Sequence, residues 1–218
     1  MRLLVVVAHP DDEVLLAGGT IAKHVAKGNE VAVLVLADGV TSRENYTNDD
    51  LHARELMLTK AKVILGYQIL YLTLDLPDNQ LDTIPLLKII KIIEKRINEF
   101  KPDMVITHYL NDLNIDHQIV ANAVMVACRP LGSVKEIYFG EVQSSTEWAV
   151  KDGFTPNVFV DISETFEKKM SALHCYESEM REWPHPRSYE AIKSLAQWRG
   201  ATVCIDKAEA FMLGRLAK

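Results

Sequence analysis

The chain has 218 residues, of which 48% are hydrophobic and 25% are charged, and its formal net charge is −6. This length and composition are typical of a soluble globular protein, and we expect a single domain spanning residues 1–218. The acidic balance, with no dense cluster of lysine and arginine, argues against nucleic acid as a partner.

The first apolar segment is short and ends at a polar motif. The run LLVVV is followed within two residues by His9 and then by three acids, which excludes a secretory signal peptide. No apolar run approaches the roughly 18 residues that a membrane span needs. The three cysteines are far apart and form no CxxC pair, which indicates neither a disulfide framework nor a thiolate metal site. We therefore expect a cytoplasmic protein.

The first predicted elements are two strands with a helix between them. Residues 3–8 and 31–37 are continuous apolar runs, typical of strands buried in a parallel sheet. Residues 14–28 carry apolar side chains at helical spacing. A second helix is predicted from an N-cap within residues 48–50 to about Leu65.

The same alternation continues through the middle of the chain. Residues 68–74 predict a strand and residues 86–100 an amphipathic helix. Residues 104–108 predict the next strand, residues 120–127 a helix and residues 136–142 a further strand. This order of strands and helices with short links predicts a Rossmann-like α/β fold, in which helices flank both faces of a mostly parallel sheet.

Beyond about residue 140 the alternation loosens, which predicts a C-terminal extension of the same domain. Residues 158–163 predict a strand that leads into a helix through Met170 to about Met180. The proline-rich segment EWPHPRSYE predicts a loop, and a last helix is predicted near residues 189–199.

Polar motifs follow two of the predicted strands. AHPDDE, residues 8–13, comes at the end of the first strand, and NIDH, residues 114–117, follows strand 104–108. In open parallel sheets, functional groups gather outside the carboxyl ends of the strands. Carboxylates fill the start of the first helix, where they would repel a phosphate, and no glycine-rich phosphate loop is present. These features exclude a dinucleotide site and a P-loop.

A divalent metal explains the two motifs better than an anion does. His9 and Asp12 are three residues apart, so a turn entering a helix can aim both at one point, and His117 offers a third ligand. Nitrogen and oxygen ligands together suit Zn²⁺, and three protein ligands leave a fourth position for water, as in catalytic zinc sites. A second carboxylate beside the ion could accept the proton of that water. Spacing does not decide which of Asp11 and Asp12 has which role.

The AHPDDE and NIDH motifs resemble those of the LmbE/PIG-L family of zinc-dependent N-deacetylases. Three later segments, SSTEW (144–148), FTPNVFVDIS (154–163) and EMREWPHPRS (179–188), are similar to a recurring subgroup of that family. The resemblance implies a Rossmann-type fold and removal of acetyl groups from molecules that contain N-acetylglucosamine.

The resemblance also assigns roles to individual residues. It makes His9, Asp12 and His117 the zinc ligands and Asp11 the general base. Arg54 matches the place where members of the family hold their sugar ligand.

One position departs from the family pattern. Many members have HPDH, whose first histidine is taken to polarise the carbonyl or to protonate the leaving amine, and this chain has Asn114 there. An asparagine can donate a hydrogen bond to an oxyanion but cannot deliver a proton. We therefore expect Asn114 to act at most on the oxyanion, and His185 is the candidate general acid. Glu13 is expected to support the helix start, and Asp116 to orient a neighbouring side chain.

The sequence thus predicts a zinc-dependent hydrolase acting on an acetylated amino sugar conjugate, a small-molecule partner. Two alternatives remain open: an amidase that cleaves a larger amide, and a non-catalytic, metal-dependent sugar-binding module. Retention of Asp11 argues against the binding module, which has no need of a spare carboxylate beside the metal. A homo-oligomer is compatible with the sequence, which does not identify the substrate.

Overall fold

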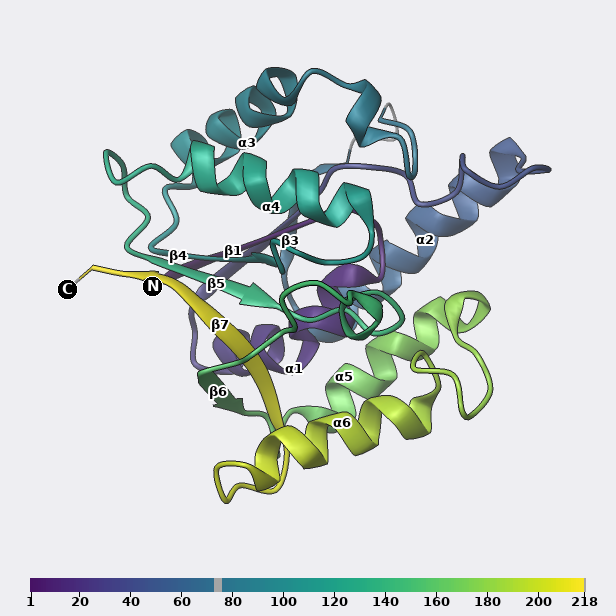
Figure 1. Cartoon of the computed structure of the whole chain (residues 1–218), viewed down its shortest axis with the longest axis vertical. Coiled ribbons are helices and arrows are strands. Elements are labelled where there is room, and N and C mark those ends of the chain that lie inside the picture. Colours follow the sequence, from purple (N-terminus) through teal and green to yellow (C-terminus); the bar gives the residue numbers. More distant parts are fainter. Residues whose placement is uncertain (73–75, 218) are drawn as a thin grey trace.

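Within the residues that the structure describes, seven strands form one sheet in the order β3-β2-β1-β4-β5-β7-β6 (Figure 1). The computed structural model describes residues 1–72 and 76–217. The strands are β1 Arg2–Val7, β2 Glu30–Val35, β3 Gln68–Leu72, β4 Met104–His108, β5 Glu136–Gly140, β6 Val158–Asp161 and β7 Ala208–Leu216. Strands β1 to β5 run parallel, whereas β7 is antiparallel to both β5 and β6. The prediction of a mostly parallel sheet is confirmed.

In these described ranges, six α-helices cover the sheet on both faces (Figure 1). They are α1 Asp12–Ala26, α2 Asn48–Leu65, α3 Leu86–Phe100, α4 Ile115–Ala127, α5 Phe166–Leu173 and α6 Tyr189–Ala201. One buried apolar cluster contains residues of α1, α2, α5 and α6, and a second contains residues of α3 and α4. The helices therefore form two layers with the sheet between them.

The first strand belongs to both apolar clusters, because alternate side chains of a strand point to opposite faces. Leu3, Val5 and Val7 pack in the cluster with α1 and α2, and Leu4 and Val6 pack in the cluster with α3 and α4. All five side chains are fully buried. This explains why the run is apolar throughout rather than alternating.

Two helix starts differ from the sequence-based prediction. The N-cap of α2 is Thr47, whose side chain accepts from the backbone of Asp50, rather than a residue within 48–50. Helix α4 begins at Ile115, five residues before the predicted start, because the polar residues of its first turn hide the helical pattern. His117 therefore lies on a helix, not in a loop.

The C-terminal third departs most from the prediction. The helix expected to reach about Met180 ends at Leu173 and continues as a 3₁₀ segment, His174–Glu179. Strand β7 was not predicted at all. Of the predicted strand 68–74, residues 73 and 74 lie outside the described residues.

The strand order creates a topological switch point at β1, which lies between β2 and β4. The chain proceeds from β1 to β2 and β3 on one side of β1 and then crosses to β4 on the other side. Ligand sites of open α/β sheets lie at such a switch point, outside the carboxyl ends of the strands. The AHPDDE motif follows the carboxyl end of β1, and the NIDH motif follows that of β4. In the described part of the chain, no helix combines the length and the apolar character needed to cross a membrane.

Candidate metal centre

The segment after β1 makes a strained turn into α1. Asp11 is the N-cap of α1 and has φ 112° and ψ −31°, a conformation that residues with a side chain rarely adopt. Such strain persists only where the surroundings enforce it, and it is concentrated at functional sites. The turn places His9 and Asp12 beside each other: the backbone N–H of His9 donates to Asp12 Oδ2 at 2.8 Å.

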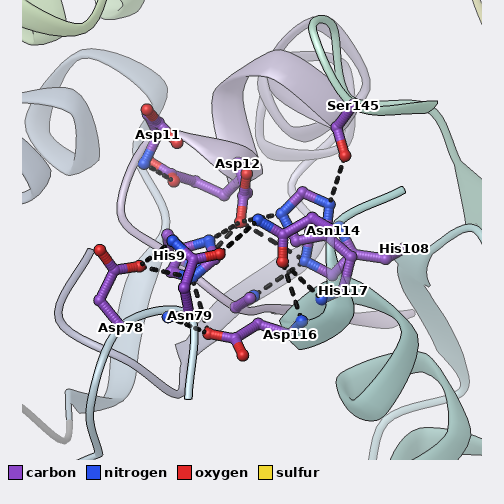
Figure 2. Close-up of polar contacts among 12 residues, drawn as sticks. His9, Asp11, Asp12, Asp78, Asn79, His108, Asn114, Asp116, His117 and Ser145 are labelled. Atoms are coloured by element: carbon purple, nitrogen blue, oxygen red, sulfur yellow. Dashed lines mark hydrogen bonds and ion pairs between the residues drawn. The ribbon is translucent and has the colours of Figure 1, made fainter. Parts of the chain in front are cut away.

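The three ligands predicted from the sequence come together in the structure (Figure 2). His9 Nδ1 and His117 Nε2 each lie 3.3 Å from Asp12 Oδ2. One ligand atom from each of the three residues lies within 4.8 Å of the others, and all three residues are buried. His9 lies in the turn after β1, Asp12 is the first residue of α1, and His117 lies in the first turn of α4.

Outer carboxylates fix which nitrogen of each imidazole faces Asp12. His117 Nδ1 lies 3.1 Å from Asp112 Oδ1, and His9 Nε2 lies 3.1 Å from both Asp116 Oδ2 and Asp78 Oδ1. A neutral imidazole has one N–H, and these carboxylates accept it. The lone pairs of His9 Nδ1 and His117 Nε2 then point at an anionic oxygen.

That arrangement requires a positive charge at its centre. His117 Nε2 and Asp12 Oδ1 are buried and have no hydrogen-bond partner among the described residues. Burial lowers the pKa of His117, but the carboxylates of Asp12 and Asp112 outweigh it and raise that pKa to about 9. A divalent cation would supply the same positive charge, and His9, Asp12 and His117 have the ligand types and the positions to bind one. The group His9, Asp78 and Asp116 also has metal-ligand geometry. It shares His9, and Asp116 already accepts the backbone N–H groups of Asn79 and Leu81.

Asp112 orients His117, a role that the sequence analysis missed. Its carboxylate accepts hydrogen bonds from Ser145 Oγ and, at 2.5 Å, from Thr146 Oγ1. Both hydroxyls belong to the SSTEW segment, so a loop after β5 supports the ligand on α4. Asp116 contacts His9, which agrees with the orienting role expected for it.

The two oxygens of Asp11 have different surroundings. Oδ2 accepts from Arg54 Nη2 at 3.2 Å and from Arg187 Nη1 at 3.0 Å. Oδ1 is buried and has no hydrogen-bond partner among the described residues. Burial raises the pKa of Asp11, and the charges of Arg187 and Arg54 oppose that rise. One oxygen is thus anchored by cations while the other can receive a proton.

Arg54 is buried, with only 4% of its surface exposed, and it contacts acids on both sides. Its Nη1 lies 2.9 Å from Glu179 Oε1, which also accepts from Arg43 Nη2. The predicted contact of Arg54 with a sugar stays a prediction. In the structure, its guanidinium holds the carboxylate of Asp11.

Arg187 was not selected in the sequence analysis, although it lies in the EWPHPRS segment. Besides Asp11, its guanidinium contacts the loop after β5: Nε donates to Ser144 Oγ at 2.8 Å and to the backbone oxygen of Gln143 at 3.3 Å. The proline-rich loop and the loop after β5 are thereby joined to the start of α1.

The side chain of Glu13 supports the turn at the start of α1, as expected for it. Its Oε2 accepts from the backbone N–H of Asp11, and its Oε1 accepts from the hydroxyls of Tyr67 and Tyr176. Burial raises the pKa of Glu13 to about 7, although the hydrogen bonds from Tyr176 and Asp11 lower it.

The side chain of Asn114 caps α4. Its Oδ1 accepts from the backbone N–H groups of Asp116 and His117, and its Nδ2 donates to Asn79 Oδ1 at 3.0 Å. The oxygen is therefore committed to the helix start, and only the remaining N–H of the amide is available to an oxyanion. The oxyanion role of Asn114 stays a prediction.

Two further histidines, His185 and His108, are not members of the group formed by His9, Asp12 and His117. His185 Nδ1 accepts from the backbone N–H of Arg187, and its ring packs edge-on against Trp148. Its role as general acid stays a prediction. His108 is fully buried, accepts from the backbone N–H of Ala8 and stacks on His117 at 3.9 Å between ring centroids. Burial lowers the pKa of His108 to about 3, so it packs as a neutral ring.

Comparison with known sequences identifies one family. The profile described as PIG-L, GlcNAc-PI de-N-acetylase, matches residues 4–128. A curated relative from Bacillus anthracis, probable N-acetyl-α-D-glucosaminyl L-malate deacetylase 2, is 27% identical over 185 residues. The alignment covers 82% of this chain and 81% of that protein.

Solved structures share the fold at low sequence identity. N,N'-diacetylchitobiose deacetylase from Pyrococcus horikoshii has a TM-score of 0.77 at 21% identity, covering 98% of this chain and 84% of that one. GalB, the 4-carboxy-2-hydroxymuconate hydratase from Pseudomonas putida KT2440, has a TM-score of 0.75 at 22% identity, covering 100% and 98%. Because these two proteins are named for different reactions, the fold does not select the chemistry, which has to be inferred from the site.

Proposed function

This chain belongs to the PIG-L family of GlcNAc-PI de-N-acetylases, and from that premise we propose that it is a zinc-dependent N-deacetylase. Its substrate is an N-acetylglucosamine-type amino sugar conjugate, and its products are acetate and a free amine. The observation that supports this most directly is the pair of imidazole nitrogens, one of His9 and one of His117, that face Asp12 Oδ2. Beside them, Oδ1 of the preceding residue, Asp11, has no hydrogen-bond partner among the described residues.

His9, Asp12 and His117 would hold the zinc ion. Bound there, Zn²⁺ would polarise the acetamide carbonyl and lower the pKa of a water molecule towards ~7. The protein keeps the ligands in register through Asp116 and Asp112, each of which accepts the N–H of one imidazole.

Asp11 acts as the general base and takes the proton of the attacking water on Oδ1. Arg54 and Arg187 support this role because they bind Oδ2 and so fix the plane and direction of the carboxylate. A general base that is held in position typically raises the rate of such a reaction by a factor of about 10²–10⁴.

Cleavage of the C–N bond requires a proton on the leaving nitrogen. Two groups can deliver it: Asp11, which has just accepted one, or His185, as the sequence analysis expected. His185 lies two residues from Arg187, which contacts Asp11, but its own contacts are with Trp148 and the backbone of Arg187. Substitution of His185 separates the two routes, as described below.

The test is acetate release from a panel of N-acetylglucosamine conjugates, free, lipid-linked and nucleotide-linked, with and without a chelator. We expect release from at least one conjugate, loss of release with the chelator, and recovery on addition of Zn²⁺. A parallel panel with longer N-acyl groups tests the amidase alternative, because preferential cleavage of a longer acyl group would support it.

Failure to release any acyl group, with zinc fully loaded, would contradict the proposed function. Binding of the same conjugates without turnover would then support the sugar-binding module. The proposal includes a cytoplasmic location, and a homo-oligomer is compatible with it.

A further inference from the structure

Helix α1 is broken at Ala17, its sixth residue, which Gly18 and Gly19 follow. Ala17 has φ −147° and ψ 17°, which is not helical, although helical geometry continues on both sides. In a regular helix the N–H of Gly19 would donate to the carbonyl of Leu15, and that of Thr20 to Leu16. Breaks of this kind arise where another group inserts into the ladder of helical hydrogen bonds.

The inserted group is a buried ion pair from the C-terminal third of the chain. Lys169 of α5 and Glu209 of β7 form it, with 2.7 Å between Nζ and Oε1. Glu209 accepts the N–H of Gly19 at 2.9 Å and the N–H of Thr20 at 2.7 Å. Lys169 Nζ donates to the carbonyl oxygen of Leu15 at 2.8 Å. The pair thus bridges the two backbone groups that a regular helix would join directly.

The glycines make room for this arrangement. A Cβ at Gly19 would lie 2.7 Å from Ile162 Cγ2, and one at Gly18 would lie 3.2 Å from Lys169 Cγ. A side chain at Gly19 would therefore clash with Ile162, the residue after β6, whereas the contact at Gly18 would be tight. Both charged side chains are about 5% exposed, so their desolvation has to be balanced by these contacts.

We propose that Lys169 and Glu209 are positioning residues for the metal centre. They hold the first half of α1, Asp12–Leu16, at an angle to the second half, and so set where Asp11 and Asp12 stand relative to His117. Both residues lie outside residues 4–128, the part of the chain that matches the family profile. This inference rests on the proposed metal site, but not on the proposed substrate or reaction.

The test uses a double variant, Lys169→Met with Glu209→Gln, in the full-length protein. The single variant Glu209→Gln would leave the ammonium of Lys169 buried without its partner and could fail to fold, whereas the double variant removes both charges. Its glutamine amide offers one acceptor oxygen where the carboxylate offered two, and Leu15 loses its donor.

A matched control is the pair Glu141→Gln with Arg199→Met. Arg199 Nη2 lies 2.7 Å from Glu141 Oε2, and these side chains are 18% and 15% exposed. None of the hydrogen bonds described for this pair reaches the backbone of α1. It therefore reports the effect of losing a partly buried ion pair from the same side of the sheet.

Zinc affinity by chelator competition is the first measurement. We expect the Lys169/Glu209 double variant to bind zinc at least about tenfold more weakly than the control, as for changes that disturb the support of a metal ligand. With zinc saturated, kcat is expected to fall while KM stays constant. Equal zinc affinity in the two double variants would overturn the inference.

Hydrogen exchange of the peptide that covers residues 8–20 is the second measurement, and it needs neither metal nor substrate. Exchange at Gly19 and Thr20 is expected to accelerate in the Lys169/Glu209 double variant and not in the control. Unchanged exchange would also overturn the inference. A parent protein that binds zinc normally but releases no acetate would contradict the proposed function and leave this inference standing, whereas a parent that binds no zinc would overturn both.

Discussion

Asp11 and Asp12 are adjacent in the chain, yet the fold gives their carboxylates opposite surroundings. Asp11 contacts two guanidinium groups, whereas Asp12 lies within 3.5 Å of three imidazoles. Imidazoles can share a metal with a carboxylate, and guanidinium groups cannot. The geometry therefore supports separate roles for two acids that sequence spacing alone could not distinguish.

Asp11→Asn is expected to keep the metal and to lose turnover by a factor on the order of 10²–10⁴, because the amide cannot accept the proton. Metal content of the purified variant and acetate release with saturating zinc are the measurements. Asp12→Asn is the matched control and is expected to lose the metal. Zinc loss in Asp11→Asn with retention in Asp12→Asn would show that the two roles are exchanged.

His185→Ala is expected to lower kcat without changing metal content if this histidine protonates the leaving amine. The measurement is the pH–rate profile, whose basic limb reports the essential acid. Arg187→Lys is the companion variant, because it weakens the ion pair with Asp11 Oδ2 and leaves the imidazole of His185 in place. An unaltered profile in His185→Ala would leave Asp11 as the proton donor.

The sequence predicted the proposed ligands but not everything around them. His9, His117 and the acids of AHPDDE could be selected because they follow recognisable strands, and parallel strands end at one edge of a sheet. The choice of Asp12 over Asp11 as a ligand came from the family resemblance. Arg187 could not be placed, since it is 176 positions from Asp11 and only the packing of the C-terminal loop brings them together. Asp112 had a signal, an acid in the same loop as the NIDH motif, which was overlooked in favour of Asp116.

At the scale of single elements, α4 shows how a substituted motif residue can acquire a structural function. Asn114 has φ −71° and ψ 125°, and its side chain accepts two backbone N–H groups at the start of the helix that bears His117. Asparagine is among the best N-cap residues. The side chain of Asn114 therefore stabilises the turn that carries His117, a proposed ligand.

Asn114→Ala is expected to destabilise the protein by about 1 kcal/mol, because two N–H groups of α4 lose their acceptor. Urea unfolding of the metal-free protein measures this change. Asn114→Asp keeps an acceptor at the same place and is expected to stay close to the parent in stability. A loss as large in Asn114→Asp as in Asn114→Ala would contradict the capping role.

Gly19→Ala is expected to destabilise the protein by about 1–3 kcal/mol, the usual cost of overpacking, because its methyl group would meet Ile162. Gly153→Ala is the control, since nothing lies within 4 Å of a Cβ built there. Adding Ile162→Ala to Gly19→Ala is expected to relieve the steric part of the loss. Equal unfolding free energies for Gly19→Ala and Gly153→Ala would refute the close approach.

Elements with a clear apolar pattern, continuous or periodic, were predicted, whereas β7 has neither pattern and was missed. The buried parallel strands and the amphipathic helix α3 follow their patterns closely. Strand β7 is exposed along its second half and contains the buried charge of Glu209, so it resembles neither a buried nor an alternating strand. The early end of α5 has a similar cause, because the chain after Leu173 packs Tyr176 inward through a 3₁₀ segment.

At the scale of the whole molecule, the proposed metal would join segments that are far apart in the sequence. His9 and Asp12 follow β1, while His117 stands on α4 beyond three further strands. A cation bound to all three would stabilise the folded chain over the unfolded one by mass action.

Addition of Zn²⁺ at about 100 times its Kd is therefore expected to raise stability by about 2.7 kcal/mol, and Tm by on the order of 5–10 °C. Differential scanning calorimetry of metal-free and metal-loaded protein measures the shift. His117→Ala is expected to abolish it, and His174→Ala, which alters a histidine outside the cluster, is expected to keep it. A Tm that does not respond to zinc would contradict a metal site formed by folding.

The bent first helix is secured by the last strand, and this order has a consequence for the newly made protein. Gly19 and the Glu209 carboxylate that accepts its N–H are 190 positions apart. At the usual rate of synthesis, an interval on the order of 10–40 s separates their appearance from the ribosome. During that interval the AHPDDE motif has been synthesised, but Glu209, which accepts the N–H of Gly19 at the break in α1, has not. The proposed metal centre can therefore reach the geometry described above only after Glu209 has been synthesised.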